Sequence, residues 1–301
     1  KNCLGWRILC YAAVVRDGLN KVFGVMDMQV FRHSPLPRAY TNYLGRKLFL
    51  FLLTIQGIGA FALITLGVMI TKFGAANRVV RPMIRQEIMR SGLRLLPMFL
   101  FLAVALGLLV IGQTVAVLAR VGAINYLGTI MVVSVVRELG PLLAALLVLA
   151  RVGTANVVEL GTARALGEVE ALEALGIDPV HYLVVPRVIG MALGIFSLTV
   201  YLIIAALISG YVWAFLQDVP LTPGDYFKQL VGALGWMDFV LLALKTCSLG
   251  FFIAIVTCYH GLAQPLRLEE VSRATVRAVG QGVIACVLLD AIFIVLYLLA
   301  G

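Results

Sequence analysis

Residues 134–187 read SVVRELGPLLAALLVLARVGTANVVELGTARALGEVEALEALGIDPVHYLVVPR, and the rest of the chain is arranged around this stretch. Arg137 and Glu138 lie side by side within an apolar run, with Gly140-Pro141 directly after them. The chain then enters a polar, acidic, helix-prone segment and returns to apolar sequence at Pro186. An ion pair at membrane depth, joined by one helix to a compact acidic loop, is typical of a transport protein rather than of an enzyme active site.

The composition is that of a polytopic membrane protein. Of the 301 residues, 62% are hydrophobic and 13% are charged, whereas soluble proteins have about 45–50% apolar and about 25% charged residues. The formal net charge is +9, but the basic residues cluster beside apolar runs and do not interleave with aromatic ones. This distribution indicates membrane topology rather than nucleic-acid binding. The five cysteines have no ligand spacing, so we expect neither a disulfide framework nor a metal site.

The N-terminal part carries many basic residues and does not form a clear first span. Residues 1–47 alternate short apolar stretches with Lys and Arg, which predicts a cytoplasmic segment on the membrane surface; a poorly ordered tail is the alternative. Residues 48–70 are long enough to span, but basic residues flank them on both sides. We therefore expect an interfacial or re-entrant elbow helix there, with Gly57 and Gly59 as a place to bend.

Five cleaner spans follow, at roughly 95–119, 126–150, 188–216, 239–259 and 283–300. Basic connections alternate with connections that have few basic residues, so the positive-inside rule predicts that 71–94, 151–187 and 260–282 are cytoplasmic and that the C-terminus is outside. The 188–216 span is longer than one crossing requires, which predicts a tilt or a break near Ser209-Gly210.

Ionisable residues within the predicted spans are the first candidates for function. Arg137 and Glu138 lie near the middle of the 126–150 span, and Pro141 leaves a backbone carbonyl free near residue 137. They are expected to line a substrate cavity or a hinge, or alternatively to form a fixed ion pair that ties two helices together.

Further polar residues lie on the other spans. Lys245 and Asp290 are expected to pair with each other or across a subunit boundary, with a structural role favoured. Gln113 and Asn125 are further polar candidates along the same path.

The connection at 151–187 contains a second candidate surface. Residues 162–175 are rich in Ala, Leu and Glu, which predicts a short amphipathic helix with Gly176 as its C-terminal stop. Asp178-Pro179 prevents continuation of this helix. Its apolar stripe consists of Leu166, Val169, Leu172 and Leu175. Its acidic face consists of Glu170 and Glu173. Such a helix can dock into a groove on a soluble partner; a solvated loop helix is the alternative.

Common catalytic motifs are missing from the sequence. It contains no GxxxxGK[ST] phosphate loop, no HExxH and no GxSxG, and His33, His181 and His260 are scattered. We therefore expect a chain that is not an enzyme and that holds no cofactor of its own.

The stretch at 134–190 closely resembles the MlaE/YrbE permease family, the membrane subunits of MCE-type lipid ABC transporters. The matching pieces are Arg137 to Pro141, Ala150 to Gly153, Glu159 to Gly161, Glu170 to Pro179, Pro186-Arg187 and, further on, Ser272 to Thr275. The likeness covers roughly residues 78–301. It divides the chain into an N-terminal segment (1–47), an elbow or re-entrant helix (48–77) and a permease domain (78–301).

The resemblance implies a homodimeric permease in the bacterial inner membrane, with a cytoplasmic N-terminus and a periplasmic C-terminus. Each protomer would have an elbow helix and about five spanning helices. Two copies of a P-loop ATPase, which bind ATP and Mg, would engage the loop at 159–178. The coupling candidates in this loop are Glu159, Arg164, Glu170, Glu173, Gly176 and Asp178.

On the periplasmic side the resemblance implies an MCE-domain protein, and it allows for a STAS-domain protein beside the ATPase. The substrate would be a phospholipid or a similar lipid, held in a cavity at the dimer interface. The transport would maintain outer-membrane lipid asymmetry or lipid supply. The alternatives are a small-solute ABC importer permease and a secondary transporter coupled to protons through Glu138 or Asp290.

Overall fold

The computed structural model describes residues 38–72, 77–122, 126–216, 222–262 and 267–300, and these ranges contain helices and no strand. The expected all-helical class is confirmed for them. The chain divides into two compact parts, residues 1–71 and residues 72–301. The predictions for Asn125 and for most of the segment 1–47 lie outside the described residues.

In the first part, α2 (Arg38–Lys72) is a single helix of 35 residues. Its residues 54–71 are long and apolar enough to cross a membrane. The helix continues through Gly57 and Gly59, so the structure has no break at the expected bend. The Thr65 hydroxyl donates to the Phe61 carbonyl at 2.8 Å, which keeps this polar group satisfied within the helix. The elbow placement of 48–70 stays a prediction.

The second part is built from long helical rods. The first rod comprises α3 (Asn77–Ser91), η1 (Leu93–Leu95), α4 (Leu96–Leu106), η2 (Gly107–Ile111) and α5 (Gly112–Val121). The second comprises α6 (Leu127–Met131), η4 (Val132–Leu139), α7 (Gly140–Val148), η5 (Leu149–Gly153) and α8 (Thr154–Ala165). The short α9 (Glu168–Ala174) leads to the third rod, η6 (Val180–Val184) with α10 (Val185–Leu216). The short α11 (Pro223–Ala233) precedes α12 (Trp236–Leu262) and α13 (Leu268–Ala300).

These rods contain nearly all of the five predicted spans. The helical stretches that are long and apolar enough to cross a membrane are 81–118, 127–165, 180–216, 236–262 and 268–299. They extend beyond the apolar runs because polar, helix-forming residues continue the backbone ladder past the end of each run. The predicted connection 71–94 is therefore mostly α3, and much of 151–187 is helical as well.

The predicted break near Ser209-Gly210 is wrong, because α10 is continuous from Val185 to Leu216. Gly210 instead allows a close helix crossing: a Cβ at this position would overlap the side chain of Ile111 in η2. A Cβ on Gly107 would likewise overlap Ser209 and the backbone of Ala206. Small residues at such crossings let two membrane helices approach closely.

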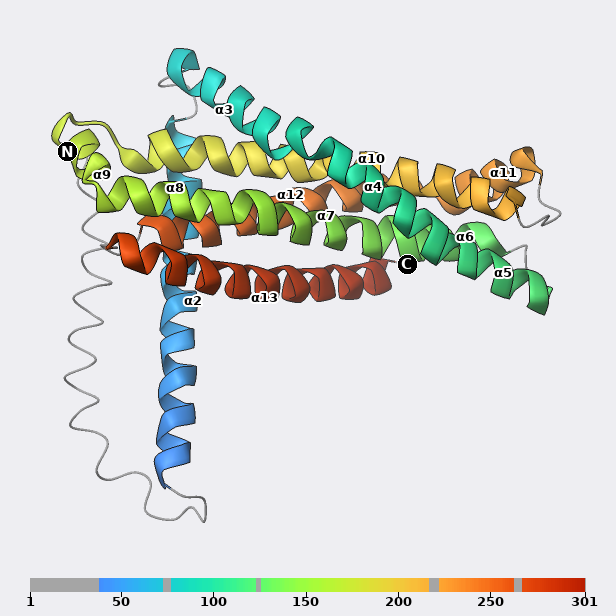
Figure 1. The fold of residues 1–301 in the computed structure, drawn as a ribbon, viewed down its shortest axis with the longest axis horizontal. Helices are drawn as coiled ribbons and strands as arrows, with labels where there is room; N and C mark the ends of the chain where they lie inside the picture. Colours follow the sequence, from blue (N-terminus) through green and yellow to red (C-terminus); the bar gives the residue numbers. More distant parts are fainter. Residues whose placement is uncertain (1–37, 73–76, 123–125, 217–221, 263–266, 301) are drawn as a thin grey trace. The chain divides into compact units, whose positions relative to one another are not determined.

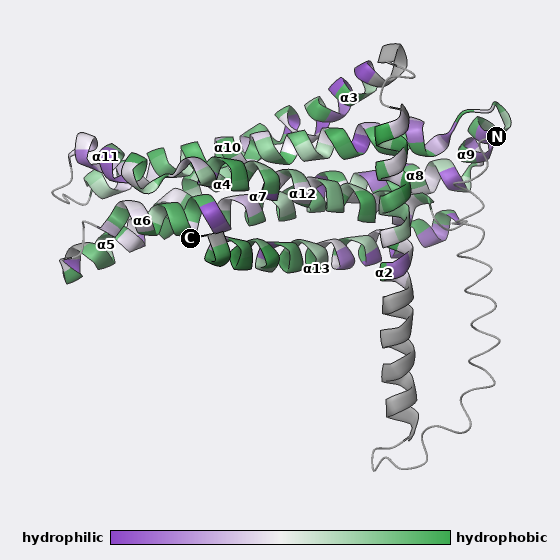
Figure 2. Ribbon diagram, turned by 180° about the vertical axis from the view of Figure 1, so that it is seen from behind, coloured by the Kyte–Doolittle hydropathy of each residue, from purple (hydrophilic) through white to green (hydrophobic). Residues whose placement is uncertain are grey.

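The rods lie alongside one another, with α10 packed against α3, α4, η2, α7 and α12, while α8 packs against α12 and α13. One end of this bundle carries α9 and the start of α13, and the other carries α5, α6 and α11 (Figure 1). We refer to them as the α9 end and the α11 end. Hydrophobic residues dominate the rods, and much of the hydrophilic colour lies on α3 and near α9 (Figure 2).

Candidate functional site

The candidate site is a set of polar side chains on facing surfaces of η4, α12 and α13. Asp238 and Lys245 are seven residues apart on α12, and Asp290 and Tyr297 are seven residues apart on α13. Seven residues are about two helical turns, so each pair lies on one face of its helix. Together with two residues of η4 they form the charged ladder, which consists of Arg137, Glu138, Asp238, Lys245, Asp290 and Tyr297.

Lys245 is the centre of the first rung and is fully buried. Its Nζ lies 2.7 Å from Asp290 Oδ1 and 3.1 Å from Glu138 Oε2, and it donates to the Arg137 carbonyl oxygen at 2.8 Å. An ammonium group has three donors, and each of them has an oxygen here. An unpaired charge at membrane depth costs on the order of several kcal/mol. The three oxygens therefore stabilise an ammonium group that the bundle could not otherwise hold. The expected pairing of Lys245 with Asp290 is confirmed within one chain.

Arg137 is the centre of the second rung. Its Nε lies 2.9 Å from Asp238 Oδ1, and its guanidinium carbon lies 5.2 Å from the centre of the Tyr297 ring. Asp238 uses its other oxygen, Oδ2, to accept from the backbone N–H of Gly235 at 2.9 Å. The rung therefore joins η4, α12 and α13 and includes the point at which α12 begins.

Arg137 and Glu138 do not pair with each other, which corrects the view of them as a single ion pair. Adjacent residues on a helix project in different directions, so each reaches a different partner on α12. The side chains of Arg137 and Glu138 remain 30% and 29% exposed, respectively, so neither is sealed in the bundle.

The backbone around these two residues is a π-helix, η4, that ends directly before Gly140-Pro141. Pro141 has no N–H, so the carbonyl four residues earlier, that of Arg137, lacks its α-helical donor. The predicted free carbonyl is present, and Lys245 occupies it. Short π segments are rare in proteins and occur frequently at functional sites.

The other predicted cavity residues lie apart from the ladder. Gln113 is exposed on α5, and within the described residues no hydrogen bond or ion pair joins it to the ladder. Pro141 is buried at the start of α7. The structure thus brings together Arg137, Glu138, Lys245 and Asp290 from the predicted set, and it adds Asp238 and Tyr297.

The second candidate surface is the α9 tip, defined here as residues 166–178. The predicted helix at 162–175 is interrupted: α8 ends at Ala165, Gly167 has φ +78°, and α9 begins at Glu168. The residue type allows this, because glycine adopts positive φ readily. The prediction of one continuous amphipathic helix is therefore wrong. The segment forms the end of α8 and the separate short helix α9.

The predicted stop at Gly176 is confirmed. Gly176 has φ +76°; its N–H donates to Glu173, and the N–H of Ile177 donates to Leu172. These two bonds form a Schellman motif, which satisfies the last carbonyls of a helix. Asp178 Oδ1 accepts from the backbone N–H of Val180 at 3.1 Å and so caps the start of η6.

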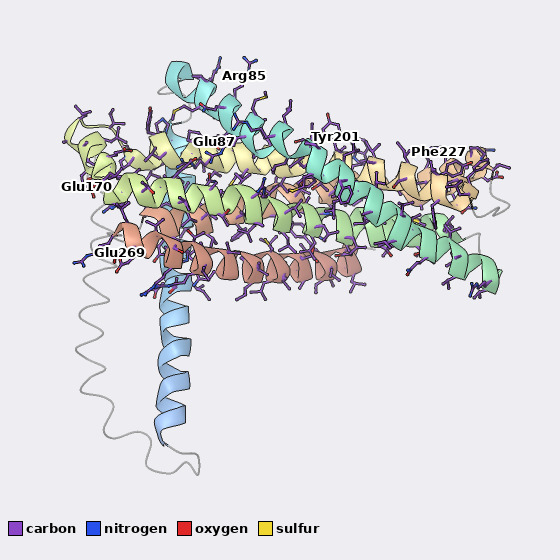
Figure 3. All side chains as sticks on the ribbon, in the orientation of Figure 1. Arg85, Glu87, Glu170, Tyr201, Phe227 and Glu269 are labelled. Atoms are coloured by element: carbon purple, nitrogen blue, oxygen red, sulfur yellow. The ribbon has the colours of Figure 1, made fainter. Side chains whose placement is uncertain are left out.

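The α9 tip exposes apolar and acidic side chains together. Leu166, Leu175 and Ile177 are 60%, 75% and 40% exposed, whereas Val169 is buried. The predicted apolar stripe is thus divided: Val169 is buried, whereas Leu166 and Leu175, the residues at the two ends of the stripe, are exposed. Glu170 projects at this end of the bundle (Figure 3) and lies 3.4 Å from Arg164. Partial burial raises the pKa of Glu173, nearby Arg164 opposes this, and Glu170 and Asp178 add to it.

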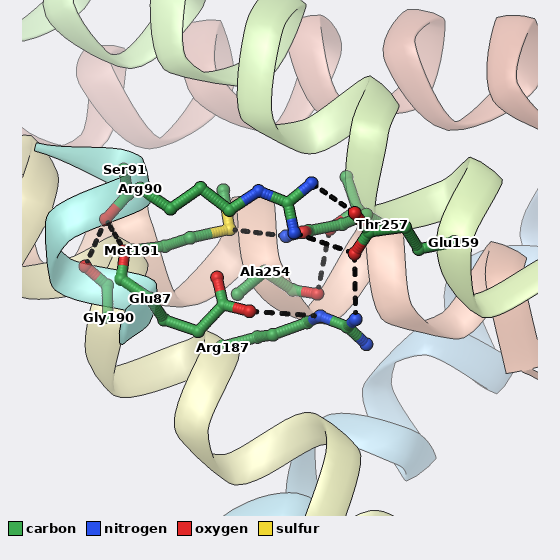
Figure 4. A network of polar contacts seen from close by, with 10 residues as sticks. Glu87, Arg90, Ser91, Glu159, Arg187, Gly190, Met191, Ala254 and Thr257 are labelled. Carbon is green, nitrogen blue, oxygen red and sulfur yellow. Dashed lines mark hydrogen bonds and ion pairs between the residues drawn. The ribbon is translucent and has the colours of Figure 1, made fainter. Parts of the chain in front are cut away.

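Glu159 belongs to a partly exposed polar network at the α9 end, on α8, rather than to the α9 tip. It forms an ion pair with Arg90 of α3, accepts from Arg187 Nη2 at 3.1 Å, and Arg187 lies 3.7 Å from Glu87 (Figure 4). Beside it, the Ser91 hydroxyl donates to the Gly190 carbonyl at 2.8 Å. The network ties α3, α8 and α10 together.

Sequence reasoning missed several of these residues. Arg90 is one of several basic residues in the predicted connection 71–94, and Asp238 directly precedes the predicted span 239–259, so neither position indicates a site by itself. The seven-residue spacing of Asp238 from Lys245, and of Tyr297 from Asp290, is the signal that could have found the second rung.

Long apolar helices whose internal charges are paired are typical of a multi-pass membrane protein. Comparison with known proteins agrees: the family described as Permease MlaE matches residues 83–296. The chain therefore belongs to the MlaE permease family.

Several curated proteins are similar over most of the chain. A probable ABC transporter permease protein of Rickettsia felis is 29% identical over 243 residues, covering 79% of this chain and 90% of the relative. One from Rickettsia prowazekii is 30% identical over 229 residues, covering 74% and 85%. The protein TRIGALACTOSYLDIACYLGLYCEROL 1, chloroplastic, of Arabidopsis thaliana is 27% identical over 207 residues, covering 68% and 58%.

Proposed function

We propose that this chain is the transmembrane subunit of an ATP-driven transporter that moves a phospholipid or a similar lipid between the bacterial inner membrane and a periplasmic MCE-domain protein. The observation that carries the proposal is the pairing of the internal charges. Each charged residue of the ladder has a counter-charge within the ladder, while the outer faces of the rods carry exposed Leu, Ile, Val and Phe. Such surfaces suit acyl chains better than a polar solute.

The comparisons support a lipid as the substrate. The name of the Arabidopsis relative contains the name of a glycolipid. A transporter of this kind supplies lipid to, or maintains the lipid asymmetry of, an outer membrane. The partly exposed Arg137 and Glu138 are the proposed residues at the lipid cavity or hinge, and a second copy of the chain completes that cavity.

ATP hydrolysis is assigned to a separate P-loop ATPase, which binds ATP and Mg and contacts the α9 tip. Exposed leucines beside Glu170 and Glu173 are typical of a helix that docks into a groove of a soluble protein. The α9 end is cytoplasmic in this proposal, because the basic residues of α3 lie near it, and the C-terminus is periplasmic. A STAS-domain protein beside the ATPase is a further proposed partner.

The test is affinity purification of the chain from native membranes in mild detergent, with identification of the co-purifying proteins by mass spectrometry. A P-loop ATPase together with an MCE-domain protein is the expected result. An ATPase with a soluble solute-binding protein would replace the proposal with a small-solute importer. Neither partner, in a preparation that retains other complexes, would favour a proton-coupled transporter that uses Glu138 or Asp290.

Transport itself is measured after reconstitution. Vesicles that contain the purified complex and a fluorescent phospholipid should transfer the lipid to the MCE-domain protein only when ATP and Mg are present. Transfer that persists without ATP and stops when a proton gradient is collapsed would contradict the proposal.

A further inference from the structure

The junction between α11 and α12 is a helix break held by a single carboxylate. α11 ends at Ala233, Leu234 has extended backbone angles (φ −85°, ψ 113°), and α12 starts at Trp236. The Gly235 N–H donates to Asp238 Oδ2 at 2.9 Å, and the Asp238 N–H donates to the Gly235 carbonyl at 3.0 Å. A side chain at the third helical position that reaches back to the N-cap N–H is half of a capping box.

The same carboxylate links this break to η4. Asp238 is 4% exposed, and its second oxygen, Oδ1, lies 2.9 Å from Arg137 Nε. The same guanidinium lies over the ring of Tyr297 on α13, with its carbon 5.2 Å from the ring centre. A buried charge needs its counter-charge, so Arg137 and Asp238 are expected to hold each other in place.

α11 itself packs against α6 and reaches α10 through one hydrogen bond. Its buried Tyr226 donates from the hydroxyl to the Leu207 carbonyl at 3.2 Å. At Gly128 of α6 a Cβ would overlap the backbone of Gln229, so the two helices touch there. Leu230 is also buried, and the Tyr226 ring lies 5.2 Å from the ring of Tyr211 on α10. The opposite side of α11 is open: Phe227 is 51% exposed (Figure 3), and Val231 is 68% exposed.

We propose that Asp238 is a positioning residue of a hinge between α11 and α12, and that Arg137 fixes this hinge to η4. Oδ2 sets where α12 begins, and Oδ1 sets where α11 lies relative to η4. A change in the π-helical turn at Arg137 then moves α11 at the α11 end of the bundle. The role does not depend on which molecule the protein transports, so it goes beyond the proposed function.

The two oxygens can be separated by mutation. Asp238→Asn keeps an oxygen that can accept from Gly235 but removes the charge that faces Arg137. Asp238→Ala removes both contacts. Lys228→Gln is the matched control, because it removes a charge from an exposed position on α11 itself.

The measurement is hydrogen–deuterium exchange of the purified full chain in lipid nanodiscs, read by mass spectrometry on peptides that cover residues 223–238. For Asp238→Asn we expect exchange about 10-fold faster along all of α11, since loss of a paired buried charge frees the whole segment. Lys228→Gln should match the wild type. Arg137→Gln should give the same acceleration. The Arg137→Gln, Asp238→Asn double variant should exchange less than about two-fold faster than either single variant, because both substitutions remove the same contact.

Unchanged exchange in Asp238→Asn would overturn the proposal, and so would a change confined to residues 235–238, which would make Asp238 a local helix cap only. If the Asn variant is not recovered folded, Arg137→Gln decides the question, and wild-type exchange along α11 in that variant would equally overturn the proposal.

Discussion

Lys245 Nζ donates to the carbonyl oxygen of Arg137 at 2.8 Å, four residues before Pro141. The proline leaves this carbonyl without its helical donor, and the buried ammonium needs a third acceptor besides Glu138 and Asp290. The contact therefore satisfies a backbone acceptor and a side-chain donor at once. It also fixes the position of α12 along the axis of η4.

Lys245→Met is expected to destabilise the bundle strongly. The substitution keeps much of the side-chain volume but leaves two carboxylates without their cation and the Arg137 carbonyl without a donor. Removal of one partner of a buried ion pair costs about 3–5 kcal/mol, which corresponds to a fall in Tm of roughly 10 °C for a unit of this size. Tryptophan fluorescence during heating in detergent measures it. Lys228→Met on exposed α11 is the control, and equal Tm values for the two variants would show that the first rung contributes nothing to stability.

Glu159→Gln is expected to loosen α3 from α8 and α10. The amide keeps one acceptor for Arg90 or Arg187 but loses the charge that both guanidinium groups share. Hydrogen bonds to charged groups contribute about 1.5–3 kcal/mol, and Glu159 is partly exposed, so we expect a fall in Tm of roughly 5 °C.

The same heating experiment tests this, with Glu269→Gln as the control because Glu269 is exposed at the start of α13. The effect of Glu159→Gln should shrink in high salt, since partly exposed ion pairs are screened. A salt-independent loss would mean that packing, rather than charge, is responsible.

Gly250→Ala is expected to separate α12 from α10. A Cβ at this position would lie 2.5 Å from Ala192 Cα and 2.9 Å from its nitrogen, and the backbone of α10 cannot move aside as a side chain could. Overpacking of this kind costs about 1–3 kcal/mol. Gly232→Ala on α11 is a matched control, because nothing lies within 4 Å of its added Cβ. A Tm for Gly250→Ala at or above that of the control would contradict the close crossing.

The broad architecture could be predicted from the sequence, because apolar runs of about 20 residues report the membrane thickness directly. Helix ends were harder to predict. Polar residues such as those of α3 form helices as readily as apolar ones do, so hydropathy alone predicts helices that are too short. The stop at Gly176 was predictable because it depends on a local backbone requirement.

The site was predictable in part for a related reason. A charge inside an apolar run is conspicuous, so Arg137, Glu138, Lys245 and Asp290 were found from the sequence. Their partners depend on how three helices rotate against one another, which no single segment encodes. Asp238 lies near the end of its span, where an acid is unremarkable, and so its contact with Arg137 was not predicted. The prediction of one continuous helix over 162–175 is wrong at Gly167, where the backbone turns with positive φ although the neighbouring residues favour a helix.

Reversal of charge at the α9 tip should separate transport from folding. Glu173→Lys changes an exposed carboxylate, and surface substitutions usually alter stability by less than about 0.5 kcal/mol. If this face contacts the proposed ATPase, the variant should fold normally but lose ATP-driven lipid transfer when it is reconstituted with the partner. Glu170→Lys should act in the same direction, with an additional local effect because it places a second cation beside Arg164.

The control for this experiment is Glu269→Lys, which reverses a charge at the same end of the bundle but on α13 (Figure 3). Co-purification of the ATPase and ATP-dependent transfer should both fall for Glu173→Lys and remain at the wild-type level for the control. Normal transfer by the Glu170→Lys, Glu173→Lys double variant would remove the α9 tip as the coupling surface. Loss of transfer with the ATPase still bound would instead mean that the tip transmits motion and contributes little to affinity.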